Sequence, residues 1–166
     1  MLARMALIAK DNSGWTVFHY ACQYGHSNIA ELIIQKSTEF NFDLNAKDDD
    51  GMTAFHFACK YGYSIIAELI IQKSAELKID LTAKDKSGWT AFHYACKKDH
   101  LIVVELIIKN SRKLIIDLNA KDSLGRTGFH LACIWNKRTL VEMMIKHAKA
   151  YKIDLTATDS DGTRIE

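Results

Sequence analysis

The chain has 166 residues, of which 48% are hydrophobic and 25% are charged, and its formal net charge is +2. This composition is typical of a folded globular domain and excludes an intrinsically disordered chain. The small net charge argues against a nucleic-acid-binding protein, which would concentrate basic residues much more strongly. No apolar run reaches the ~18 residues that a membrane helix needs, so we expect no membrane partner.

Charge is distributed unevenly along the chain. Residues 7–80 carry ten acidic and six basic side chains, whereas residues 81–154 carry seven acidic and fourteen basic ones. Such a gradient can orient a partner. The first ten residues lack the apolar core of a secretory signal, so we expect a cytoplasmic, intracellular protein whose four cysteines stay reduced.

The sequence repeats with a period of 37 residues. Glycine recurs at this step at Gly14, Gly51, Gly88, Gly125 and Gly162. A constant period between 20 and 50 residues is typical of stacked units that bury their apolar faces against one another. We therefore expect a single domain over residues 1–166, made of repeats 11–47, 48–84, 85–121 and 122–158 and a partial fifth repeat at 159–166.

Each unit begins with a short predicted helix. In the second unit, Thr53 is a suitable N-cap for the segment AFHFACKY, in which Phe55, Ala58 and Cys59 share one face by their helical spacing. Gly62 is suited to the end of this helix, because glycine adopts positive φ without a Cβ clash.

A second helix and an extended arm follow in each unit. The segment SIIAELIIQKSAELK places Ile66, Leu69 and Ile70 at helical spacing, which predicts a helix from residue 64 onward. The next segment, IDLTAKDKSG, alternates apolar and polar residues and closes on turn-forming residues. The predicted unit is therefore helix, helix and hairpin.

The residues of one unit resemble a known family. The pattern T-x-F-H-x-A-C-x-x-G, followed by I-A-E-L-I-I and D-L-N-A-K-D-x-x-G, is similar to the ankyrin repeat, whose signature is T-P-L-H-x-A in units of about 33 residues. The likeness covers nearly the whole chain. It implies an all-α solenoid of stacked helix-turn-helix units with short β-hairpin tips.

Two departures from that family bear on the structure. The signature proline is absent, and its positions are occupied by Val17, Ala54, Ala91 and Gly128. Each unit also has four additional residues near the end of the second helix, which predicts that this helix runs about one turn further. The side chains expected to pack between units along this added rim are Phe40, Leu77, Leu114 and Tyr151.

Each unit sets a histidine three residues before a cysteine, from His19 and Cys22 to His130 and Cys133. Such pairs can be zinc ligands or thiol–imidazole dyads. Alternatively, the cysteine fills a small core position and the histidine bonds to its own helix start and the neighbouring loop. Stacked units lie roughly 10 Å apart, too far for a disulfide between equivalent cysteines. We therefore expect no metal, no cofactor and no enzyme activity, since every candidate residue recurs at the 37-residue step.

Function should lie where the units differ, because the residues common to all units serve the fold. The variable positions fall at the hairpin tips and on the first helices, and the resemblance implies that these form a concave partner-binding face. They are rich in residue types that are enriched at interfaces, and we expect these positions to be exposed. The predicted partner-binding residues are Trp15, Tyr20, Tyr24, Asp49, Asp50, Met52, Phe57, Tyr61, Lys86, Trp89, Tyr94, Lys97, Lys98, Leu124, Arg126 and Trp135. The alternative is that Trp15 and Trp89 merely pack against adjacent hairpins.

These observations predict a protein–protein interaction module that binds another protein. The alternative is a structural segment, or an excised or artificial scaffold, without a partner of its own. A further candidate role, seen in some ankyrin proteins, is that Asn45 and Asn119 are substrates of an asparaginyl hydroxylase. The first unit repeats the interior pattern without a polar cap, so end-to-end self-association is a further candidate.

Overall fold

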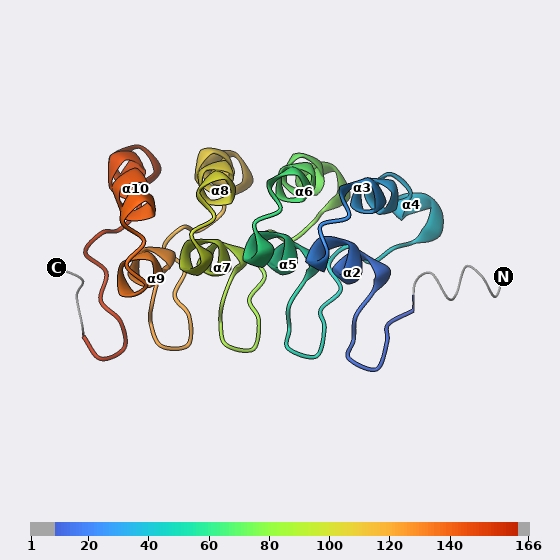
Figure 1. Ribbon diagram of the computed structural model, residues 1–166, viewed down its shortest axis with the longest axis horizontal. Coiled ribbons are helices and arrows are strands. Elements are labelled where there is room, and N and C mark those ends of the chain that lie inside the picture. Colours follow the sequence, from blue (N-terminus) through green and yellow to red (C-terminus); the bar gives the residue numbers. More distant parts are fainter. Residues whose placement is uncertain (1–8, 163–166) are drawn as a thin grey trace.

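The computed structural model describes residues 9–162, in which nine α-helices form four stacked units (Figure 1). The first helices of the units form one row and the second helices form another, while long loops project from the first row away from the second (Figure 1). The fold is thus an all-α solenoid of helix pairs, as predicted. Residues 1–8 and 163–166, the latter belonging to the predicted partial fifth repeat, lie outside the described residues. Within residues 9–162, no helix combines the length and the apolar character needed to cross a membrane.

The first helix of each unit begins after a threonine N-cap. Thr53 has an extended backbone, and its side chain forms a capping box with that of His56 at the start of the helix. Gly62, with a φ of 75°, ends the same helix in the left-handed conformation, as predicted. The four first helices are α2 (Val17–Gln23), α5 (Ala54–Tyr61), α7 (Ala91–Lys98) and α9 (Gly128–Ile134).

The second helices of the last three units have 14 residues each, which confirms the predicted additional turn. They are α6 (Ser64–Leu77), α8 (Leu101–Leu114) and α10 (Arg138–Tyr151). The rim residues that pack against the core, as predicted, are Leu77, Leu114 and Tyr151.

The second helix of the first unit is interrupted. It consists of α3 (Ser27–Gln35) and the single turn α4 (Ser37–Phe40), which are separated at Lys36. Thr38 stands in this unit where the second unit has an alanine, and threonine is a weaker helix former. Phe40 is half-buried, and its ring lies 6.1 Å from that of Phe42.

The hydrophobic core lies between the two rows of helices and between neighbouring units. All residues from Ala54 to Cys59 are buried, because α5 packs against α2 on one side and α7 on the other. Ala67 is completely buried on α6, and Ile66 and Ile70 beside it are buried as well. The apolar face of each unit is therefore covered by the next unit, as a fixed repeat period requires.

The tips are closed by turns rather than by β-hairpins. Within residues 9–162 no regular strand forms, apart from one isolated bridge residue, so the prediction of β-hairpin tips is wrong. In the second unit, the Asp48 carboxylate accepts hydrogen bonds from the backbone N–H groups of Asp50 and Met52. One hydrogen bond, from the Asp49 N–H to the Ser13 carbonyl at 3.0 Å, links this tip to the preceding one. A single bond for each pair of tips is too few for a strand ladder.

The second helices end on residues in the left-handed conformation. These residues are Asn41, Lys78, Ile115 and Lys152, with φ between 54° and 57°. Ile115 is the unusual member, because a β-branched side chain is disfavoured at positive φ. Its side chain is 86% exposed, so packing does not compensate for the strain.

We predict that Ile115→Asn raises the free energy of unfolding by about 1 kcal/mol, because asparagine tolerates the left-handed conformation better. Urea unfolding followed by circular dichroism measures the change. The chain offers the reciprocal control, since Asn41→Ile at the equivalent position should lower the stability. A lower midpoint for Ile115→Asn would contradict the assignment of strain to this residue.

Candidate functional site

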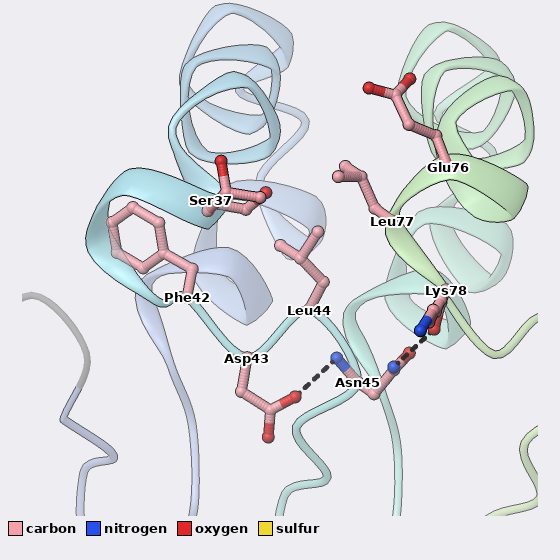
Figure 2. Close-up of a pocket in the computed structure, with 9 residues that line it drawn as sticks. Ser37, Phe42, Asp43, Leu44, Asn45, Glu76, Leu77 and Lys78 are labelled. Atoms are coloured by element: carbon pink, nitrogen blue, oxygen red, sulfur yellow. Dashed lines mark hydrogen bonds between the residues drawn. The ribbon is translucent and has the colours of Figure 1, made fainter.

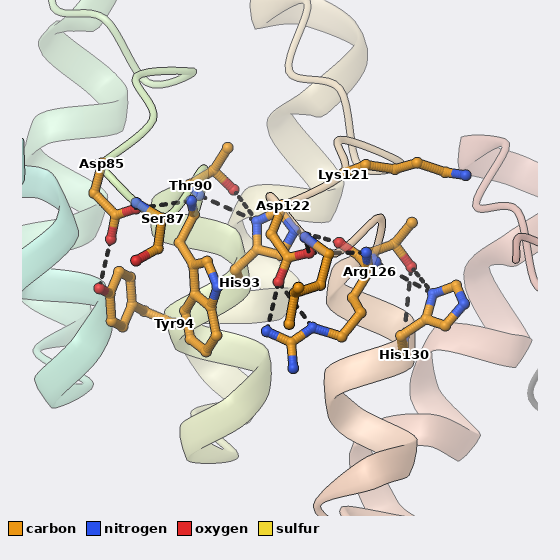
Figure 3. A network of polar contacts seen from close by, with 12 residues as sticks. Asp85, Ser87, Thr90, His93, Tyr94, Lys121, Asp122, Arg126 and His130 are labelled. Atoms are coloured by element: carbon orange, nitrogen blue, oxygen red, sulfur yellow. Dashed lines mark hydrogen bonds and ion pairs between the residues drawn. The ribbon is translucent and has the colours of Figure 1, made fainter. Parts of the chain in front are cut away.

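The candidate site is built on a repeated histidine frame. His19 Nδ1 accepts a hydrogen bond from the backbone N–H of Thr16 at 3.0 Å, and His19 Nε2 lies 3.1 Å from the carbonyl oxygen of Met52 in the next tip. A carbonyl oxygen only accepts, so Nε2 carries the proton and the ring is the neutral tautomer that bridges two units. The same bridge recurs from Thr53 through His56 to Trp89 and from Thr90 through His93 to Arg126. Figure 3 shows the third unit.

Burial keeps these imidazoles neutral. It lowers the pKa of His19, His56 and His93 below the usual 6.5, although the hydrogen bonds to the next tip partly oppose the shift. The histidines therefore bond to their own helix start and to the neighbouring loop, which confirms the structural interpretation of the His-x-x-Cys pairs.

The four cysteines are free thiols. Cys22, Cys59 and Cys96 are buried, and burial raises their pKa values above the usual range, so they stay protonated at neutral pH. Cys133 is half-buried, and its pKa is raised for the same reason. Among the described residues, no three His, Cys, Asp or Glu side chains gather as a metal site would require.

The structure divides the sixteen predicted partner-binding residues by exposure. The exposed ones are Tyr20, Tyr24, Asp49, Asp50, Tyr61, Lys86, Lys98, Leu124 and Trp135. The half-buried ones are Trp15, Tyr94, Lys97 and Arg126. The buried ones are Met52, Phe57 and Trp89, with 4%, 3% and 9% exposure.

For the three buried residues, the expectation of an exposed position is wrong. Trp15 lies across the Phe57 ring, with ring centroids 4.5 Å apart, and this contact covers Phe57. Trp89 packs against Tyr94 at 4.9 Å, in the angle between its own tip and helix. Met52 occupies the tip position equivalent to these tryptophans. Trp15 and Trp89 thus pack against rings of the first helices, whereas the alternative interpretation placed them against adjacent hairpins.

The tip of the fourth unit is held by an ion pair between the buried Asp122 and the half-buried Arg126. The Arg126 guanidinium donates two hydrogen bonds to Asp122 Oδ2, at 2.9 Å from Nε and 2.7 Å from Nη2 (Figure 3). Burial alone would raise the pKa of Asp122, but the hydrogen bonds from Arg126 and from backbone N–H groups outweigh it and lower the pKa. Arg126 is therefore engaged within its own tip.

The exposed residues lie on the tips and at the first helices of all four units. We call this surface the tip–helix face, and it comprises the exposed predicted residues together with Lys60, Lys97 and Tyr94. Its centre is a column at the ends of the four first helices, each member 37 residues after the last: Tyr24, Tyr61, Lys98 and Trp135. Tyr24 is 58% exposed and Trp135 52% exposed, so large aromatic surfaces at both ends of the column face solvent.

Two lysines of the tip–helix face lie over aromatic rings. Lys97 Nζ is 5.0 Å from the Trp89 ring centroid and 4.8 Å from that of Trp135. Lys60 Nζ is 5.4 Å from the Tyr94 ring and also within 6 Å of the Phe57 and Tyr61 rings. Lys60 is missing from the predicted set, although its position, 37 residues before Lys97, could have identified it.

A recess lies away from the tips, between the C-terminal ends of α4 and α6 (Figure 2). Its volume is about 300 Å³, and its walls include Phe42, Leu77 and Asn45. The Asn45 side-chain amide donates to the carbonyl of Lys78 at 2.9 Å and accepts from the N–H of Asp80 at 2.8 Å. Asn119 makes the equivalent pair of bonds to the fourth unit. Both asparagines, the candidate hydroxylation sites, thus already bridge adjacent units.

The comparisons with known proteins agree with this architecture. A family model for ankyrin repeats, comprising three copies, matches residues 2–85 and again residues 77–159. No curated protein matches the chain.

We predict that the array loses stability as the pH falls below about 6.5. The pKa values of His19, His56 and His93 are lower in the folded chain than in the unfolded chain, so the unfolded chain takes up protons first on acidification. Urea midpoints measured between pH 7.5 and 5.5 should therefore decrease steadily.

His56→Gln provides the control for this prediction. It should lower the stability at pH 7.5 by about 1–3 kcal/mol, because the next tip loses a buried partner. It should also make the pH dependence shallower. The lowered pKa of Asp122 affects the stability only in a separate pH range, near pH 4 and below. Midpoints that do not change between pH 7.5 and 5.5 would contradict the histidine assignment.

Proposed function

The chain belongs to the ankyrin-repeat family, whose members generally mediate protein–protein interactions, and we propose that it binds a partner protein through the tip–helix face. The observation that carries this proposal is the exposure of Tyr24, Tyr61 and Trp135, which lie at the C-terminal ends of the first helices α2, α5 and α9. Repeats of this family are typically non-catalytic binding modules. Catalysis is accordingly assigned to no residue of the chain.

The chemistry of the tip–helix face supports the proposal. Tyrosine and tryptophan are enriched at interface hot spots, since they bury a large area with few rotatable bonds. Tyr24 and Trp135 expose more than half of their surface, and each directly follows a first helix as its C-cap. A rigid scaffold reduces the entropy lost on binding. A purely structural segment gives no reason to keep these rings in water.

We predict that the double variant Tyr61→Ala, Trp135→Ala weakens partner binding by on the order of 2 kcal/mol or more, as for a pair of hot-spot residues. Tyr61 and Trp135 are exposed, at 42% and 52%, and lie outside the buried core, so the fold should be retained. Affinity capture with quantitative mass spectrometry identifies proteins held by the native chain and lost by the variant. Titration of such a protein then measures the loss.

The matched control is Ile65→Ala, Ile102→Ala, which removes two large exposed side chains from the second helices, at 70% and 65% exposure. This variant should bind as the native chain does. If it loses the partner while the Tyr61, Trp135 variant keeps it, the binding face lies on the second helices instead. If no protein distinguishes the variants, a structural segment without its own partner becomes the better account.

End-to-end self-association is a second candidate, favoured by the two ends of the array. Ile29 and Leu32 on α3 are 52% and 55% exposed, whereas on α6 the equivalent of Ile29, Ile66, is 1% exposed and the equivalent of Leu32, Leu69, is half-buried. At the other end, Ile145 on α10 is 51% exposed, whereas the equivalent Ile108 is completely buried. Each end thus presents apolar residues that the next unit covers inside the array.

We predict that the chain associates at millimolar concentration and that Ile145→Glu abolishes this association, because a charge then faces the apolar end of a second copy. Multi-angle light scattering over a concentration series measures the mass. Ile65→Glu adds the same charge on an outer helix surface and should leave the association unchanged. A strict monomer at millimolar concentration would refute this candidate.

A further inference from the structure

The tip–helix face contains a group of lysines without acidic partners. Lys60, Lys97 and Lys98 lie on the adjacent first helices α5 and α7. Within residues 9–162, the ion pairs join carboxylates to Lys36, Lys73, Lys109, Arg126 and Arg138, and none of them includes these three lysines. Among the described residues, these three ammonium groups therefore form no ion pair with a carboxylate of the face.

Aromatic rings hold two of these ammonium groups in place. Lys97 lies between the Trp89 and Trp135 rings, and Lys60 lies among the rings of Phe57, Tyr61 and Tyr94. An aromatic face attracts the cation but offers no strong hydrogen-bond acceptor. Each ammonium group is thus positioned while N–H donors remain for an incoming anion, and a charge-assisted hydrogen bond would form with little ordering of the long side chain.

From this geometry we propose that the tip–helix face binds an acidic segment of a partner protein, with partner carboxylates on Lys60, Lys97 and Lys98. The inference rests on the proposed function and specifies the chemistry of the partner. Aromatic side chains flank Lys98 along the column, with Tyr61 on one side and Trp135 on the other. The matching segment therefore carries consecutive acidic residues with an apolar residue at each end.

Carboxylates on the neighbouring tip disfavour a nucleic acid at the same place. Asp49 and Asp50 are exposed on the tip of the second unit, the same unit whose helix α5 carries Lys60. Asp99 is exposed directly after Lys98. A phosphate backbone carries a charge at every nucleotide and would meet these carboxylates along its path. A peptide can confine its charges to the residues that meet the lysines and remain neutral elsewhere.

A fluorescein-labelled peptide with four consecutive glutamates, a leucine at each end and glycine–serine flanks tests the proposal by fluorescence anisotropy. We expect saturable binding that weakens with added salt, and at least tenfold weaker binding when glutamine replaces the glutamates. The variant Lys60→Gln, Lys97→Gln, Lys98→Gln should lose the glutamate peptide. The matched variant Lys113→Gln, Lys146→Gln, Lys149→Gln removes the same charge from second helices and should retain it.

Several results would overturn the proposal. These are an absence of glutamate-peptide binding, equal binding of the glutamate and glutamine peptides, and equal losses in the two lysine variants. If a single-stranded RNA of equal charge binds more tightly than the glutamate peptide, the partner of this face is a nucleic acid and the proposal is wrong. The proposed function is tested separately, because a captured protein lost on Tyr61→Ala, Trp135→Ala still establishes the face if the acidic preference fails.

Discussion

The register of the units depends on one interaction, the hydrogen bond from a buried histidine to the next tip, which His19, His56 and His93 each make. In the interior, His56 accepts from Thr53 at its own helix start and reaches the carbonyl of Trp89 in the following unit. The bond fixes where each tip lies relative to the preceding helix. Lysines strengthen the same register, since Lys47 Nζ donates to the carbonyl of Lys84 one period later at 2.8 Å. Because the units are held at a constant step, residues 37 apart align into columns.

The columns differ in role: those of recurring residues stabilise the fold, and we propose that those of variable residues bind the partner. Histidine, threonine and cysteine recur in every unit and are buried or engaged within the frame, so they leave little chemistry for a partner. The column at the ends of the first helices changes from Tyr24 and Tyr61 to Lys98 and Trp135, and all four side chains are exposed. A rigid frame with a variable column presents aromatic and cationic groups at defined positions, which suits recognition of another protein.

The period was sufficient to predict the helices, the threonine caps, the longer second helices and the role of the histidines, because each follows from residues that recur at one step. It could not predict the exposure of individual variable residues. Trp89 and Trp135 are both variable tryptophans, yet Trp89 packs into the angle between tip and helix while Trp135 faces solvent. That difference depends on three-dimensional contacts. The left-handed backbone conformation of Ile115 could not be predicted from the sequence either. It is imposed by the end of the helix and not by the preference of isoleucine itself.

The most direct test of the account is site-specific photo-crosslinking in cells. A photo-reactive phenylalanine derivative in place of Tyr61 lies on the tip–helix face, and the same group in place of Ile65 lies on a second helix of the same unit. The account predicts a discrete crosslinked protein from position 61 and none from position 65. A crosslink confined to position 65 would contradict the central claim that the variable residues of the tips and first helices form the binding surface.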